Sequence, residues 1–283
     1  MNSLSIFRSK VKNGFTVLEL IVTMAIITIL ATTTITSFST MARSGRLAGG
    51  KNAVIVALER ARTIAMQENK VILLIFRPTW DANHPSRPQH TEAIIAEWSG
   101  YSDVLLLPDQ FVVDRFVPVH GMRPVVLPDG IKVAAPWYDY SNQDDIWATQ
   151  SEINEMRVRS ETPGRLVGVV FDSTGSMRAD NPQTDSTVMY VDFDEDGIQD
   201  LAFNDPFFPD QFNYWIPDHP LDEVNIEVAP FLAVYDDQEA REFKFGDWSV
   251  QNIYINELCS QNGYITQHAD RLHFNRYTGD VMK

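Results

Sequence analysis

The sequence predicts an α+β protein in which one long N-terminal helix is followed by a β-rich globular domain. Three observations predict this fold class. Residues 15–38 form a 24-residue apolar run, long enough to cross a bilayer core of about 30 Å as a helix. Between Gly50 and Asn69, apolar residues recur at helical spacing. After residue 70, short apolar runs alternate with turn residues, which is typical of strands.

The composition fits a folded, exported domain after this helix. Of the 283 residues, 44% are hydrophobic and 11% aromatic, which is enough for a substantial core. The formal net charge is −15, and without the three basic residues of the first 14 positions, 20 basic residues stand against 38 acidic ones. An acidic surface disfavours direct nucleic-acid binding, which depends on Lys and Arg at the phosphates. The single cysteine, Cys259, excludes an internal disulfide, and we expect it to be a buried apolar residue.

The apolar run has the features of a membrane anchor and contains one unusual residue. Arg8, Lys10 and Lys12 precede it, and basic flanks place this end in the cytoplasm and the rest of the chain outside. Glu19 is the only charged residue of the run. A carboxylate at the centre of a membrane costs about 2.5–3.5 kcal/mol, so Glu19 is either tolerated near the headgroups or functional. A secretory signal peptide would have a shorter apolar region followed by a small-residue cleavage site.

The segment Gly14-Phe15-Thr16-Val17-Leu18-Glu19-Leu20 resembles the processing motif of type IV pilins and pseudopilins, in which a basic leader ending in Gly precedes Phe-Thr-Leu-Ile-Glu-Leu. The resemblance implies that a prepilin peptidase removes the leader, residues 1–14, by cleaving between Gly14 and Phe15, and that Phe15 is N-methylated. It also implies that Glu19 pairs with the terminal amine of a neighbouring subunit in a filament. Such a pairing is physically reasonable, because a buried carboxylate is tolerated when it meets an opposite charge.

We expect the helix to continue past the apolar run. Residues 15–38 then form the transmembrane or filament-core part, and residues 39–69 form an amphipathic half that lies under a sheet. The stripe of this amphipathic half comprises Val54, Leu58, Ala61, Ala65 and Glu68 at three- and four-residue steps. Thr36 stands where many pilins carry a helix proline. Each Gly costs about 1 kcal/mol inside a helix, so the glycines at 45, 49 and 50 predict that the helix weakens over residues 44–50.

Residues 70–283 are expected to form the exported β-rich domain. Strands are predicted at residues 71–76, 94–98, 104–107, 125–133, 164–171 and 188–191, and in a C-terminal hairpin over 272–281. Residues 78–89 contain three prolines and are expected to form a loop. Residues 136–162 and 205–250 are rich in Asp, Asn, Pro and aromatic residues. We interpret them as insertions on the sheet, either ordinary loops or a partner surface.

Three features of this domain are similar to the H-type minor pseudopilins of type II secretion. They are Ala61-Arg62-Thr63-Ile64-Ala65 at the helix end with a strand from Val71, the strand start Leu127-Pro128-Asp129-Gly130-Ile131, and the 164–171 strand with the turn Asp172-Ser173-Thr174-Gly175-Ser176. The resemblance implies a pilin-like fold, with the helix packed on an antiparallel sheet. It also implies a structural subunit of a periplasmic pseudopilus or pilus that serves protein secretion. Its partners would be other pilins, prepilin peptidase and the bacterial inner membrane, although a DNA-uptake machine remains an alternative.

The sharpest candidate for chemistry is the acidic stretch of residues 192–200. Carboxylates at loop positions 1, 3, 5 and 9, a Gly at position 6 and a carbonyl at position 7 match the first part of a calcium-binding loop. The expected calcium ligands are Asp192, Asp194, Asp196, the carbonyl of Ile198, and Asp200. Position 12 is Phe203 rather than the Glu of an EF-hand, so Asp205 is a substitute candidate, and we expect the loop to cap a sheet edge. The alternative is a solvated acidic turn with Gly197 at positive φ.

No catalytic centre is predicted, so we expect no enzymatic activity. The six histidines show no His-Glu-x-x-His pattern, and Cys259 has no second cysteine for a zinc site. The sequence also lacks a Gly-x-Ser-x-Gly nucleophile elbow and a phosphate loop. The second hypothesis is a membrane-anchored, exported calcium-binding module or enzyme with a pilin-like anchor. Such a protein should keep its activity without Glu19, whereas a filament subunit should lose incorporation.

Overall fold

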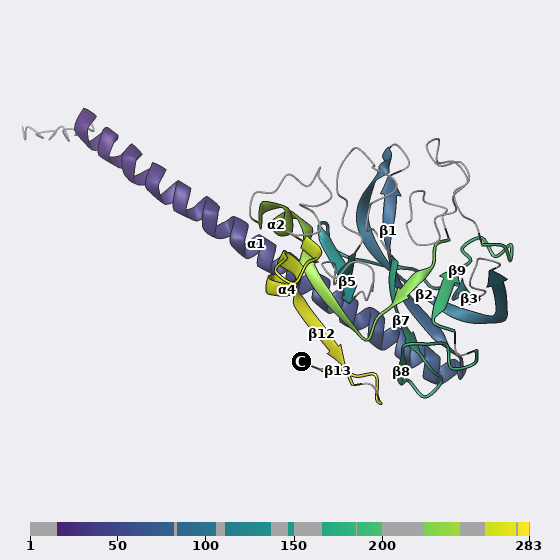
Figure 1. The fold of residues 1–283 in the computed structure, drawn as a ribbon. Coiled ribbons are helices and arrows are strands. Elements are labelled where there is room, and N and C mark those ends of the chain that lie inside the picture. The colour runs from purple at the N-terminus through teal and green to yellow at the C-terminus, as the bar shows by residue number, and fades with distance from the viewer. Residues whose placement is uncertain are drawn as a thin grey trace, which may run out of the picture. The chain divides into compact units, whose positions relative to one another are not determined.

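The computed structural model describes residues 16–81, 84–105, 111–136, 147–149, 166–184, 186–199, 223–243, 258–275 and 277–282. The predicted leader, residues 1–14, lies outside them. The chain divides into two compact units, Met1–Ser44 and Gly45–Lys283. The predicted α+β class is confirmed, because one long N-terminal helix is followed by a domain built on two β-sheets (Figure 1).

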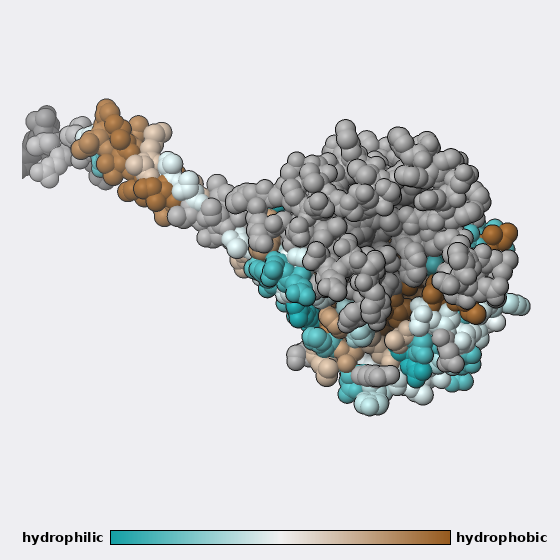
Figure 2. Space-filling view, viewed as in Figure 1, coloured by the Kyte–Doolittle hydropathy of each residue, from teal (hydrophilic) through white to brown (hydrophobic). Residues whose placement is uncertain are grey.

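The first unit is helical throughout its described part, apart from Thr16. Helix α1 (Val17–Glu68) starts here, and the apolar side chains of its first turns are largely exposed (brown in Figure 2). Threonine hydroxyls donate hydrogen bonds to carbonyls four residues earlier, from Thr23 to Glu19 and from Thr28 to Met24, so they are satisfied within the helix. Among the described residues, no helix combines the length and the hydropathy of a membrane span.

In the second unit, α1 is buried along the predicted stripe. Four of the five stripe residues, Val54, Leu58, Ala61 and Ala65, are at most 1% exposed. The fifth, Glu68, is exposed at the last position of the helix. Ala57 joins the buried face. The small side chains of this face let the helix axis approach the strands closely.

The expected weakening of α1 over residues 44–50 is wrong, because the helix is continuous there. Gly50 is buried against strand β5 (Ile131–Pro136). A Cβ atom built on Gly50 would lie 2.5 Å from Cγ2 of Ile131. The glycine is therefore explained by close packing against the sheet, and this tertiary contact overrides its low helix propensity.

The first sheet contains a closed circuit of six strands in the order β1-β2-β3-β9-β10-β7, with β7 pairing back to β1. The strands are β1 (Ile72–Asp81), β2 (His84–Leu105), β3 (Phe111–Pro118), β9 (Val188–Val191), β10 (Ile226–Val228) and β7 (Leu166–Phe171). In addition, β8 (Met177–Arg178) pairs with β7, and β4 (Val125–Val126) pairs with β2. The sheet is mixed rather than antiparallel as expected, because β3 pairs with β9 and β10 with β7 in parallel.

Strand β1 is buried on both faces, which explains its continuous apolar sequence. Ile72, Leu74 and Phe76 belong to the main core with α1 and the second sheet. Leu73 and Ile75 belong to a separate core that β3, β7, β9 and β10 also line. Successive side chains of a strand point to opposite faces, so this strand separates the two cores.

The second sheet has the order β13-β12-β11-β5-β6. Its other strands are β13 (Val281–Met282), β12 (Asp270–Phe274), β11 (Phe231–Asp236) and β6 (Trp147–Thr149). The pairing of β12 with β13 confirms the predicted C-terminal hairpin. The short helices α2 (Asp237–Glu242) and α4 (Tyr264–His268) contribute to a third core on β5 and β11. Cys259 is fully buried in that core, as expected.

The loop predicted for residues 78–89 is wrong in its described part, because β1 and β2 continue through it as a hairpin. Pro78 pairs with Thr91 and Asp81 with His84, with register shifts between them. Strand β7 pairs with β1 only as far as Phe76. Beyond that point, among the described residues, β1 pairs with β2 alone, and a proline without an N–H is tolerated on such an edge strand.

The interpretation of residues 205–250 as an insertion is also wrong for the described part. This stretch supplies β10 to the first sheet and β11 to the centre of the second. Within the other proposed insertion, residues 136–162, β6 pairs with β5, and Trp147 is buried in the third core. Residues 137–146, 150–162, 205–222 and 244–250 of the two stretches lie outside the described residues.

Candidate functional site

The N-terminal site is built at the first turn of α1, where Thr16 and Glu19 contact each other. The backbone N–H of Glu19 donates to Oγ1 of Thr16 at 3.2 Å. In return, the N–H and hydroxyl of Thr16 donate to Oε2 of Glu19, each at 3.4 Å. This reciprocal pattern is a capping box, which satisfies backbone donors at a helix start. We did not predict this role, although Thr-x-x-Glu before an apolar run is its sequence signal, and the two processing residues Gly14 and Phe15 lie outside the described residues.

The acidic loop starts where β9 ends. The backbone N–H of Asp192 donates to the carbonyl of Phe116 at 2.8 Å, so the parallel pairing of β9 with β3 fixes its position. Asp192 is fully buried. The expectation that the loop caps a sheet edge is wrong, because β9 lies between β3 and β10.

The carboxylates of the loop shape its turns. Oδ2 of Asp192 accepts the N–H of Gly197 at 3.0 Å. Oδ1 of Asp194 accepts the N–H of Asp196 at 3.2 Å, and Oδ1 of Asp196 accepts the N–H of Ile198 at 2.8 Å. Gly197 has φ +86°, the positive value that the alternative of an acidic turn required. That value alone does not separate the two readings, since a calcium loop also needs a glycine here.

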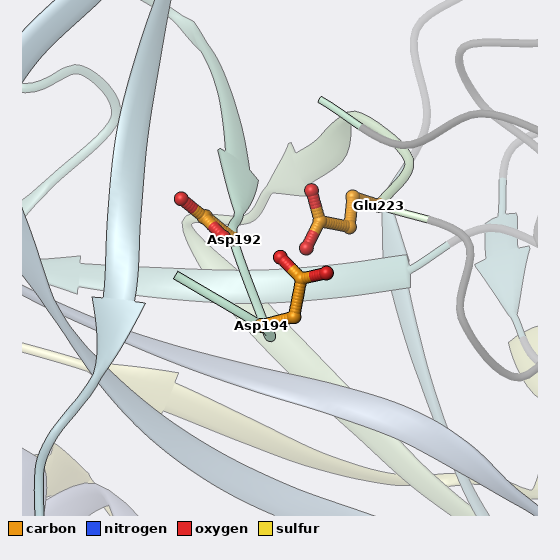
Figure 3. A group of neighbouring side chains, drawn as sticks. All are labelled: Asp192, Asp194 and Glu223. Carbon is orange, nitrogen blue, oxygen red and sulfur yellow. The ribbon is translucent and has the colours of Figure 1, made fainter. Parts of the chain in front are cut away.

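The structure brings Asp192 and Asp194 together with Glu223, which we did not predict. One carboxylate oxygen from each of the three residues lies within 4.8 Å of the others, and Figure 3 shows Asp194 and Glu223 turned toward each other. Asp196 does not belong to this group among the described residues. Ile198 contributes its N–H to the turn and exposes its side chain, and Asp200 lies outside the described residues.

Glu223 reaches the loop from the segment that precedes β10. Its side chain is 2% exposed, and its Oε1 accepts the backbone N–H of Phe193. Gln199 Nε2 donates to the carbonyl of Glu223 at 2.6 Å and to Oδ1 of Asn225 at 3.0 Å. The two segments are thus tied together. Because Glu223 follows Asp192 by 31 positions, no loop spacing could have identified it.

Two arginines contact this region in different ways. Nη1 of Arg115 lies 3.5 Å from Oδ2 of Asp192. Arg77 places its guanidinium 4.0 Å from the ring centroid of Phe193, and its own ion-pair partner is Glu92 at 2.7 Å. Tyr190 lies on β9. Burial, and then the charge of Asp103, raise the pKa of its hydroxyl above the ordinary value near 10. Tyr190 is therefore neutral at physiological pH, as its hydrogen bond to Asp103 requires.

Comparisons with known proteins identify the N-terminal segment. A family model described as the prokaryotic N-terminal methylation motif matches residues 9–35. Comparison of the chain with curated proteins and with solved structures gives no match. The matched residues include Gly14, Phe15 and Glu19, so the match supports a type IV pilin-like protein that a prepilin peptidase processes. The match does not extend to the β-rich domain.

Proposed function

We propose that this chain is a structural subunit of a pilin-like filament, a minor pseudopilin or minor pilin that serves protein secretion. The observation that carries the proposal is the methylation motif at residues 9–35, which overlaps a helix with exposed apolar side chains. In this proposal, prepilin peptidase cleaves between Gly14 and Phe15, and the new terminus at Phe15 is methylated. The chain acts by assembly, and we assign it no catalytic residue.

Before assembly, residues 15–38 anchor the chain in the inner membrane as a single pass. The basic residues of the leader keep the N-terminus in the cytoplasm, and residues 70–283 then lie on the periplasmic side or outside the cell. The helix is suited to apolar surroundings, because Thr23, Thr28 and Thr34 direct their hydroxyls to carbonyls of the same helix. Polar groups that are satisfied within a helix lower the cost of placing it in lipid.

During assembly, the same helix exchanges lipid for the apolar helices of neighbouring subunits. This exchange provides little net hydrophobic free energy, because both environments are apolar. The preference for neighbouring subunits over lipid therefore comes mostly from the charge of Glu19, which pairs with the terminal amine of a neighbour. The capping box with Thr16 holds the carboxylate at the helix start until that amine arrives.

The assignment to the H-type minor pseudopilins rests on the way the helix joins the sheets. Helix α1 ends at Glu68 and β1 starts at Ile72, without a long loop between them. The turn before β5 has Gly130 at φ +76°, and the turn after β7 has Gly175 at φ +80°. These positions correspond to the strand start and the strand-turn of the family pattern, and they support a role in secretion.

Intact mass and N-terminal sequencing of the protein from native membranes test the processing step. We expect a mature chain that starts with N-methylated Phe15. An uncut chain, or a cut after the apolar run, would contradict the proposal and leave an anchored or secreted domain.

A matched pair of variants tests the assembly step. We expect Glu19→Ala to reach the membrane normally and to lose at least about tenfold in cross-linking to neighbouring pilins or in sheared filaments, since a buried amine without its partner is costly. Thr16→Ala removes the capping box but keeps the carboxylate. This variant should lose far less cross-linking and filament incorporation than Glu19→Ala. The comparison therefore distinguishes a role of the carboxylate in docking from its role in helix capping.

The second candidate function is the anchored calcium-binding module or enzyme, which the group of Asp192, Asp194 and Glu223 favours as a calcium module. In that case Glu19→Ala should change neither the amount of membrane-bound protein nor its activity. Equal incorporation of Glu19→Ala and the unaltered chain would therefore favour the second candidate.

A further inference from the structure

We propose that Asp192, Asp194 and Glu223 bind a calcium ion that fastens the end of β9 to the start of β10. The proposal concerns the β-rich domain and does not depend on filament assembly. It differs from the sequence-based loop, because Glu223 replaces Asp196 among the ligands.

The first argument is an unsatisfied buried oxygen. Asp192 is fully buried, and its Oδ1 has no hydrogen-bond partner among the described residues. Its other oxygen, Oδ2, is already engaged with Gly197 and Arg115. A buried carboxylate oxygen without a partner is costly. A cation that binds Oδ1 together with the two neighbouring carboxylates would remove this cost.

The second argument is the spacing and chemistry of the three carboxylates. Calcium binds oxygen ligands at about 2.3–2.6 Å, so two ligands on opposite sides of one ion are about 5 Å apart. The three oxygens lie within 4.8 Å of one another, which one ion can bridge. Magnesium keeps several of its waters and is usually held by one or two carboxylates, so a group of three carboxylates favours calcium.

The third argument is the accessibility of the site. Asp192 and Glu223 are buried, whereas Asp194 is exposed. An ion can therefore enter beside Asp194 and leave its remaining coordination positions to water. Partial hydration of this kind is typical of calcium sites of moderate affinity.

The position of the group explains what the ion would stabilise. Strands β9 and β10 pair through one residue pair, Met189 with Ile226, whereas β1 and β7 pair through five. By the number of paired residues, β9–β10 is thus the weakest strand pairing in the six-stranded circuit. Asp192 and Asp194 follow β9 directly, and Glu223 precedes β10 by three positions, so a shared ion would reinforce this closure.

The test is calcium titration of the full-length chain, purified in detergent and stripped with EDTA. Isothermal titration should give one calcium site per chain, and thermal unfolding of the domain should shift upward with added CaCl2 but much less with MgCl2. We expect Glu223→Gln to weaken calcium binding by at least about tenfold, because the number of charged ligands sets affinity. Asp196→Asn is the matched control and should bind within about twofold of the unaltered chain.

The melting temperature in EDTA adds a second readout. Without calcium, Glu223→Gln should melt at or above the temperature of the unaltered chain, because it removes one of three neighbouring negative charges. With calcium, the order should reverse. No calcium binding by the unaltered chain would overturn the proposal, and so would a loss of binding in Asp196→Asn without one in Glu223→Gln. Neither result would affect the proposed filament role, which the Glu19→Ala comparison tests separately.

Discussion

The two parts of α1 differ in how far their apolar side chains are buried within the chain. Leu30, in the first unit, is 60% exposed, and Leu58, in the second, is 1% exposed. The secondary structure is the same, and the difference is the surrounding sheet. A helix with many exposed apolar residues needs a partner outside its own fold, which is the physical basis for proposing membrane and neighbouring subunits.

The types of residue differ between the two parts as well. The second part carries Gly50, Ala57, Ala61 and Ala65 on its buried face, so that it lies close to the strands. The exposed apolar residues of the first part include many large aliphatic ones, such as Ile26, Ile27 and Ile29. The small residues are therefore explained by close packing against the sheets, whereas lipid or other helices are the partners that we propose for the exposed large ones.

The largest expected effect comes from the same substitution in each part. Leu58→Ala should destabilise the domain by about 2–5 kcal/mol, because it leaves a cavity in the main core. Leu30→Ala should change the free energy of unfolding of the domain by less than about 0.5 kcal/mol. Urea unfolding of both full-length variants in detergent, followed by tryptophan fluorescence, measures the difference. A similar loss in both variants would mean that the two parts do not differ as the exposures indicate.

A second pair of variants sharpens the comparison near the boundary between the units. Gly50→Ala should destabilise the domain by about 1–3 kcal/mol through overpacking, because its Cβ would approach Ile131 to 2.5 Å. A Cβ added at Gly45 would have no described neighbour within 4 Å. Gly45→Ala should therefore stabilise the helix by about 0.5–1 kcal/mol. Thermal unfolding by circular dichroism gives both values. A stabilising Gly50→Ala would refute the close approach of helix and sheet.

These glycines also show where sequence reasoning succeeds and where it stops. The length of α1 and its buried stripe follow from local periodicity, so they were predictable. The role of Gly50 depends on Ile131, a residue far along the chain, so propensity alone gave the wrong result. The loop prediction for residues 78–89 was wrong for a similar reason. Whether a strand tolerates Pro78 depends on where β7 stops pairing with β1.

The two candidate sites show the same limit. The motif at Gly14, Phe15 and Glu19 is contiguous, so the sequence alone identified it and the family match agrees. The acidic loop was recognised from its spacing, but Glu223 was not, because it joins the loop only when β9 and β10 meet. The capping box was predictable from the sequence, since Thr16 and Glu19 have the required spacing.

The smallest expected effect tests whether charge or apolar packing holds the second part of α1 to the sheets. Nζ of Lys51 lies 3.2 Å from Oδ2 of Asp270, and the two side chains are 36% and 46% exposed. Such a surface pair contributes about 0–1 kcal/mol, and Lys51→Met keeps the aliphatic stem. Urea unfolding should therefore show a loss below about 1 kcal/mol that disappears near 1 M NaCl, where the screening length is about 3 Å. The loss in Leu58→Ala should persist at that salt concentration, because burial of apolar surface does not depend on screening. If Lys51→Met instead cost more than about 2 kcal/mol at high salt, ion pairs would determine how this part of the helix docks.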